Sequence, residues 1–134
     1  MRKTSRSSAA SLAGLTLAAG VLVGVTSQGV AQAGCNEQSG PTYPSRSGPQ
    51  GIKVVKAADS CFDFNVRSAS SNLPNGQGYE GWYLQNGRYV PGSRGFVYIR
   101  NDAQGYFVLV SSVATGTNLG ISTDTASASV LLAY

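Results

Sequence analysis

No stretch of residues 51–134 repeats apolar side chains at the spacing of an amphipathic helix. The segment instead consists of short runs rich in β-branched and aromatic residues, which are separated by glycine, asparagine and proline. Residues 62–67 alternate apolar and polar side chains, as a half-buried strand does. Asn86-Gly87 lies between two further runs and is typical of a hairpin turn, because both residues tolerate a positive φ angle. The pattern predicts an all-β fold, either a small barrel or a compact sandwich of short antiparallel strands.

Residues 96–110 form a nearly continuous apolar and aromatic stretch around a polar turn at 101–105. We expect this stretch to be a hairpin at the centre of the sheet. If its edges are exposed, the chain could alternatively be a structural surface protein that associates with itself. The sequence leaves the oligomeric state open.

The N-terminus has the three parts of a secretory signal peptide. Basic residues at positions 2, 3 and 6 precede an apolar stretch over residues 12–25, and Ala31-Gln32-Ala33 matches a signal peptidase site. We therefore expect residues 1–33 to be removed and the protein to be secreted, with no membrane anchor after cleavage. One alternative is an amphipathic helix of the folded protein. The other is a lipoprotein acylated at Cys35, although Gln32 stands where that motif usually has an aliphatic residue.

The basic charge of the chain belongs mainly to the predicted signal peptide. Removal of Arg2, Lys3 and Arg6 from the ten basic residues leaves seven, against six acidic residues that all lie after position 33. A nucleic-acid-binding domain needs a clustered basic face to neutralise phosphates. Residues 34–134 show no such cluster in sequence, so we expect no nucleic-acid partner.

Residues 34–50 are rich in Gly, Pro and Ser and predict an extended arm before a single domain at residues 51–134. Cys35 and Cys61 are the only cysteines. In an exported protein we expect them to form one disulfide, which would pin the start of the arm. Closing a loop of this length stabilises the fold by about 3.5 kcal/mol in the chain-entropy model.

The sequence offers little for catalysis. It contains no histidine, which excludes Ser-His-Asp and Cys-His sites and leaves no imidazole to bind a metal ion. The six acidic residues are scattered singly, and no glycine-rich phosphate loop or nucleophile elbow is present. We expect a protein that is not an enzyme and needs neither a cofactor nor a metal ion.

Aromatic residues are dense between positions 79 and 107. Strand alternation sends neighbouring side chains to opposite faces, so a domain of this size cannot bury all of them. Half-exposed tyrosine and tryptophan rings suit contacts with peptides or glycans. We predict a ligand-binding surface that includes Trp82, Tyr83, Tyr89 and Tyr98.

Residues 64–71, Phe-Asn-Val-Arg-Ser-Ala-Ser-Ser, resemble the Leu-Asn-Val-Arg-Ser-Gly-Pro-Ser-type motif of secreted bacterial SH3-like domains. Residues 84–90 and 105–110 are similar to later segments of that family, whereas residues 118–122 lack the tryptophan of its final Gly-Trp-Val signature. The resemblance implies a small barrel in which Asn65 and Arg67 brace a turn. It also implies binding of cell-wall peptide or protein ligands without chemistry.

These observations favour a secreted, non-catalytic module that binds cell-wall peptide or glycan, or an extracellular protein, through the aromatic surface. The alternative is a secreted protease inhibitor, for which residues 68–78 are the candidate loop. That loop lies outside the predicted disulfide, so no covalent bond would hold it rigid in a protease cleft.

Overall fold

The computed structural model describes residues 34–134, which form one compact unit. The predicted signal peptide lies outside the described residues. Residues 34–134 contain no helix that is long and apolar enough to cross a membrane. The all-β prediction is confirmed for this part of the chain, because all of its regular elements are strands.

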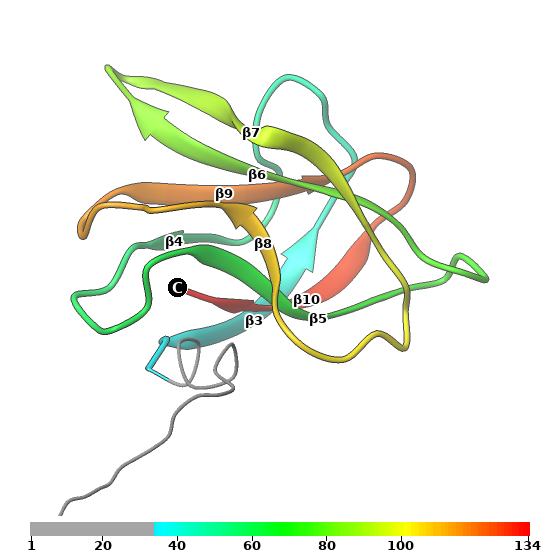
Figure 1. Ribbon diagram of the computed structural model, residues 1–134. Helices are drawn as coiled ribbons and strands as arrows, with labels where there is room; N and C mark the ends of the chain where they lie inside the picture. The colour runs from blue at the N-terminus through cyan, green and yellow to red at the C-terminus, as the bar shows by residue number, and fades with distance from the viewer. Residues whose placement is uncertain (1–33) are drawn as a thin grey trace, which may run out of the picture. The chain divides into compact units, whose positions relative to one another are not determined.

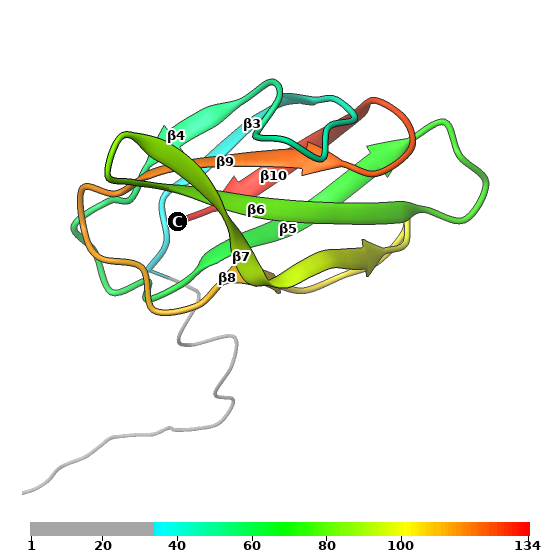
Figure 2. The ribbon, with the colours of Figure 1, turned by 90° about the horizontal axis from the view of Figure 1, so that it is seen from above.

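The strands of residues 34–134 form two antiparallel four-stranded sheets that face each other (Figures 1 and 2). The first sheet has the order β3-β10-β5-β8 and the second has the order β4-β9-β6-β7. In chain order the strands are β3 (Glu37–Thr42), β4 (Lys53–Val55), β5 (Phe64–Ser71), β6 (Gln77–Gln85), β7 (Arg88–Ile99), β8 (Phe107–Val110), β9 (Asn118–Thr123) and β10 (Ala128–Ala133).

Of the two predicted architectures, the compact sandwich is the one observed, since the sheets do not close into a barrel. The core lies between the sheets, where alternate residues of facing strands meet. Phe64, Val66 and Tyr79 are fully buried there, together with Leu109 and Leu132. Gly81 allows β8 to approach β6, because a Cβ atom at this position would lie 2.6 Å from the Cβ atom of Leu109.

The hairpin predicted at Asn86-Gly87 is confirmed. Asn86 and Gly87 have φ angles of 54° and 78°, and Gln85 pairs with Arg88 at the end of the β6–β7 ladder. The prediction for residues 96–110 is wrong, because β7 and β8 lie in different sheets and each is an edge strand. The short turn at Asn86-Gly87 pairs β7 with β6. After Ile99 the chain therefore crosses to the other sheet, where β8 pairs with β5.

Residues 34–50 are not a separate arm, and the fold does not begin at residue 51. Strand β3 pairs with β10 along its whole length. The Pro41 carbonyl points away from β10 and accepts a hydrogen bond from the Ile52 amide. The nitrogen of Pro41 points to the same side, so the missing N–H of proline costs no hydrogen bond to β10. Beyond β3, the segment 43–50 is held to the second sheet by hydrogen bonds from Ser45 to Thr123 and from Gln50 to Ile121.

Candidate ligand-binding site

The predicted aromatic surface divides between the two faces of the second sheet. Trp82 and Tyr83 are consecutive on β6, so their side chains point in opposite directions. Tyr79 and Tyr83 share the face that packs against the core, whereas Glu80 and Trp82 share the outer face. Tyr89 pairs with Leu84 and therefore lies on the outer face as well. The structure thus brings Trp82 and Tyr89 to one face and separates Tyr83 from them.

Trp82 is buried and is not part of an open surface. Its indole Nε1 donates a hydrogen bond of 2.9 Å to the Ser122 hydroxyl, and only 3% of the residue is exposed. Trp82 pairs with Gly120 on β9, and Pro49 lies directly over Gly120. The segment 43–50 crosses the outer face at this point and covers Trp82. The prediction that the Trp82 ring contacts a ligand is therefore wrong, because the ring is buried.

The other aromatic residues of the outer face, Tyr89, Phe96 and Tyr98, lie on β7. Tyr98 is the most open of the four predicted residues, with 59% of its surface exposed. Phe96 is half-buried, and the Arg46 guanidinium lies 4.8 Å from the centre of its ring. Glu80, the partner of Phe96 in the ladder, is buried beneath this region. Burial raises the pKa of the Glu80 carboxyl above its ordinary value, and the nearby charge of Arg46 opposes part of that rise.

Tyr83 lines a cavity of about 350 Å³ on the opposite face, which we call the Tyr83 cavity. Besides Tyr83, four of its lining residues carry hydroxyl groups, namely Ser93, Ser111, Ser112 and Thr117, and three are apolar, namely Val110, Val113 and Ala114. No carboxylate, ammonium or guanidinium group lines it. The cavity can therefore offer one aromatic ring and several neutral hydrogen-bonding groups, but no fixed charge.

The loop 111–117 supplies most of the other lining residues of the Tyr83 cavity. The segment 56–63 holds this loop in place. Asp63 Oδ1 accepts a hydrogen bond of 2.9 Å from the Ser112 amide, and the Phe62 carbonyl accepts one of 2.8 Å from the Val113 amide. Lys56 exchanges two backbone hydrogen bonds with the far end of the loop, each 2.8 Å long. Ser112 adopts a positive φ angle of 55°, so the loop turns sharply where it meets Asp63.

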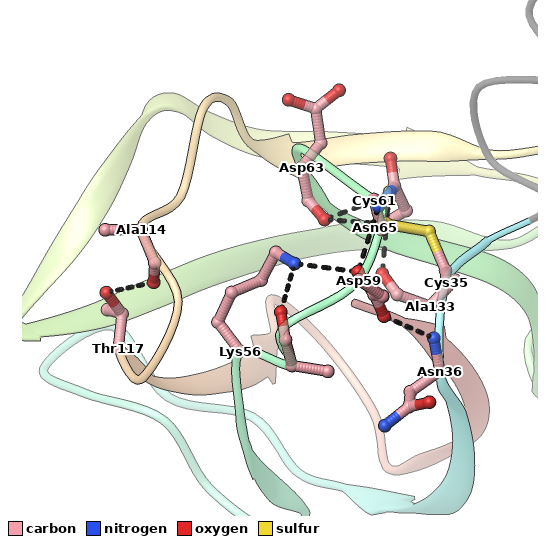
Figure 3. Close-up of polar contacts among 11 residues, drawn as sticks. Cys35, Asn36, Lys56, Asp59, Cys61, Asp63, Asn65, Ala114, Thr117 and Ala133 are labelled. Carbon is pink, nitrogen blue, oxygen red and sulfur yellow. Dashed lines mark hydrogen bonds and ion pairs between the residues drawn. A yellow bond between two sulfur atoms is a disulfide. The ribbon is translucent and has the colours of Figure 1, made fainter.

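The segment 56–63 is itself braced by a polar network around the disulfide (Figure 3). Cys35 and Cys61 are bonded, as predicted. Lys56 is buried, and its Nζ atom donates to the Ala57 carbonyl at 2.9 Å and to Asp59 Oδ1 at 3.2 Å. Asp59 also accepts hydrogen bonds from the backbone amides of Cys61 and Asn36.

This network sets the protonation of Asp59. Burial alone would raise the pKa of its carboxyl, but the hydrogen bonds from Cys61, Lys56 and Asn36 outweigh it and hold the pKa below its ordinary value. Asp59 is therefore ionised at neutral pH and compensates the buried charge of Lys56. The disulfide, the ion pair and the loop 111–117 form one continuous support for the Tyr83 cavity.

The loop proposed for protease inhibition is shorter than the sequence suggests, because β5 continues to Ser71 and β6 begins at Gln77. Residues 72–75 are bent and not extended, although their connection reaches beyond the ends of the sheets (Figure 2). Asn101 braces it, accepting from the Ser71 amide at 3.1 Å and donating to the Leu73 carbonyl at 2.5 Å.

No motif in the sequence marks the loop 111–117 as part of a site. Its serine, threonine and alanine residues have the composition of an ordinary connection. Two sequence features could have indicated this loop: Gly116, a residue that suits a turn, and the apolar run directly before residue 111. Within residues 34–134, no three His, Cys, Asp or Glu side chains lie close enough to hold a metal ion.

Asn65 and Arg67, which the SH3-like resemblance makes structural, both bind neighbouring strands or turns. The Asn65 amide donates to the carbonyls of Asp63 and Ala133, each at 3.3 Å, and Arg67 pairs with Glu37 at 2.6 Å. Comparison with known proteins finds no matching family model, no matching curated sequence and no matching solved structure. Membership of the SH3-like family therefore stays a prediction.

Proposed function

We propose that this protein is a secreted, non-catalytic binding module, and that the Tyr83 cavity takes an uncharged segment of a cell-wall glycan or its attached peptide. The observation that carries the proposal is the lining of the cavity, which combines one aromatic ring with four hydroxyl side chains and no charged group. Its volume of about 350 Å³ falls within the range of roughly 300–1,000 Å³ that is usual for small-molecule sites.

The chemistry of the lining favours a neutral, hydroxyl-bearing ligand. The apolar face of a sugar ring can lie against the Tyr83 ring, while serine and threonine hydroxyls act as both donors and acceptors towards ligand hydroxyls. A charged ligand would lose hydration in the cavity without gaining a partner of opposite charge. The same lining lacks a carboxylate or imidazole for proton transfer, which supports binding without chemistry.

Export is part of the same proposal. The N-terminal pattern predicts a signal peptide, and a disulfide is typical of proteins that fold in an oxidising compartment. A stable fold stapled by one disulfide suits a protein that works outside the cell.

A pull-down with washed, protein-free peptidoglycan tests the proposal. Residues 34–134 form a compact unit with its own core and disulfide, so they can be produced alone. We expect saturable binding that resists salt, and we expect Tyr83→Ala to weaken it by about ten-fold or more. The matched control is Tyr98→Ala, which removes a more exposed tyrosine from the other face.

Two results would contradict the proposal: no binding by the wild-type protein, or equal losses in the two tyrosine variants. The same preparation should be titrated against subtilisin and trypsin. Stoichiometric loss of protease activity, with no binding to peptidoglycan, would replace the wall-binding function with inhibition.

A further inference from the structure

The outer face of the first sheet carries a second neutral surface, on residues that the proposed function does not use. Two rows of paired residues cross β3, β10 and β5 on this face. The first row is Pro41, Ser129 and Ser70, and the second, two residues further along β10, is Ser39, Leu131 and Ser68. Residues paired directly across strands share a face. Their neighbours Ala69 and Val130 point into the core, so these two rows face outward.

Two hollows on this face join into one groove, which we call the Tyr43 groove. One has a volume of about 360 Å³ and is lined by Tyr43, Ser70 and Ser129 among others. The second has a volume of about 290 Å³ and shares Ser70 and Ser129 with the first. Because adjacent strands are about 4.8 Å apart, a groove that crosses β3, β10 and β5 is roughly 10 Å long.

The hydroxyl groups of this groove are available to a ligand. Within residues 34–134, the side chains of Ser39, Ser68, Ser70 and Ser129 have no hydrogen-bond partner in the protein. All four residues are exposed. Each hydroxyl can both donate and accept, so this array matches a ligand that carries many hydroxyl groups of its own.

The charges beside the groove are already neutralised. Arg67 pairs with Glu37 at 2.6 Å across the sheet, and its guanidinium lies 5.6 Å from the centre of the Tyr106 ring. No charged side chain lines either hollow. A phosphorylated, sulfated or acidic ligand would therefore lose hydration there without gaining an opposite charge, whereas an uncharged ligand needs no opposite charge.

Tyr43 provides an aromatic contact at one end of the groove. It is 45% exposed, yet its backbone is fixed, because its amide donates to the Gln50 carbonyl and its carbonyl accepts from the Thr123 amide. A ring held by a rigid backbone gives contact area at a low cost in conformational entropy. Leu131, half-buried in the middle of the face, adds a small apolar contact for the faces of sugar rings.

We propose that the Tyr43 groove binds an extended, uncharged polysaccharide chain, at a site separate from the Tyr83 cavity. A shallow, open groove fits the side of a polymer better than a single small molecule. A peptide fits less well, since the lining offers no deep apolar pocket for a side chain. Two sites in one domain would also strengthen attachment to a polymer through multivalency.

Depletion of residues 34–134 from solution by insoluble chitin and by microcrystalline cellulose tests this site. Ser129→Arg places a long charged side chain in the middle of the groove, and we expect it to weaken binding to the preferred polymer by about ten-fold or more. Tyr43→Ala should weaken the same binding by a similar factor. The matched control is Ser47→Arg, which adds the same charge at an exposed position outside the groove and should bind within about two-fold of wild type. Fluorescence of Trp82, the single tryptophan, verifies that each variant is folded.

Failure of this proposal can be told apart from failure of the proposed function. If the wild-type protein binds neither polymer, or if Ser129→Arg binds as well as Ser47→Arg, the Tyr43 groove is not a polysaccharide site. Loss of peptidoglycan binding in Tyr83→Ala would still support the Tyr83 cavity in that case. If Ser129→Arg abolishes polymer binding while Tyr83→Ala has no effect on peptidoglycan, the groove stands and the Tyr83 proposal falls.

Discussion

Trp82 is buried on the outer face of the second sheet, with its Nε1–H bonded to Ser122, whereas its neighbour Tyr83 lines an open cavity. We predict that Trp82→Ala lowers the free energy of unfolding by about 3 to 5 kcal/mol, the usual cost of truncating a buried large aromatic residue. Urea unfolding followed by circular dichroism measures this loss without depending on tryptophan emission. A change below about 1 kcal/mol would mean that the ring is on the surface and that the segment 43–50 does not cover it.

Glu80 should make stability fall as the pH rises above its ordinary pKa. Because burial raises the pKa of Glu80 in the folded state, the folded protein holds this proton more tightly than the unfolded chain. The contribution of Glu80 to stability is therefore fully present below the unfolded pKa and is lost as the pH rises through the folded pKa.

We expect Glu80→Gln to remove that decrease and to raise the melting temperature at pH 7. Melting curves of both proteins between pH 4 and pH 8 measure the effect. Parallel pH profiles for the two proteins would show that Glu80 titrates as it does in water.

Asp59 should have the opposite pH dependence. The pKa of its carboxyl is depressed in the folded state, so its contribution is present above the unfolded pKa and is lost as the pH falls through the folded pKa. Asp59→Asn leaves the buried ammonium of Lys56 without an opposite charge. We predict a loss of about 3 kcal/mol at pH 7, the usual cost of breaking a buried ion pair from one side.

The double variant Asp59→Asn with Lys56→Met is the control for this pair. Replacing both partners removes the uncompensated charge, so it should recover much of the stability that the single variant loses. Equal stability of the single and double variants in urea unfolding would contradict the role given to this ion pair.

At the scale of elements, the disulfide supports the loop 111–117 through the segment 56–63. Reduction, or a double Cys35→Ser and Cys61→Ser change, should lower stability by about 3.5 kcal/mol in the chain-entropy model. It should also loosen the loop before the sheets unfold, because the loop is bonded to Phe62 and Asp63, next to the disulfide. Hydrogen exchange should therefore speed up first at the amides of Ser112 and Val113. An increase spread evenly over all strands would contradict this order.

Local patterns predicted the elements whose partners are near in sequence. The β6–β7 hairpin follows from Asn86-Gly87, and alternation correctly placed Trp82 and Tyr83 on opposite faces. Partners far apart in sequence were not predictable from such patterns. The pairing of β3 with β10 joins residues near 40 to residues near 130, and the separation of β7 from β8 depends on which sheet has room for each strand.

The candidate site was predictable only in part for the same reason. Tyr83 was identified from its residue type, but the decision between Tyr83 and Trp82 depends on the segment 43–50, which is distant in sequence and covers one of them. The pairing of Cys35 with Cys61 needed no structure, since no other cysteine is available. The contribution of residues 111–117 needed the fold, because only the fold brings that loop to the same cavity as Tyr83.

At the scale of the whole molecule, residues 34–134 are a sandwich with different chemistry on its surfaces. The Tyr83 cavity and the Tyr43 groove are neutral and rich in hydroxyl groups, whereas the outer face of the second sheet combines Arg46, Phe96 and the exposed Tyr98. Of these surfaces, we propose that the Tyr83 cavity holds the ligand.

Hydrogen–deuterium exchange of residues 34–134, with and without soluble glycan fragments released from peptidoglycan, locates the bound ligand. We expect slower exchange in residues 110–117 and around Tyr83 when the fragments are bound. Unchanged exchange in those residues, or protection confined to the strand around Tyr98, would contradict it.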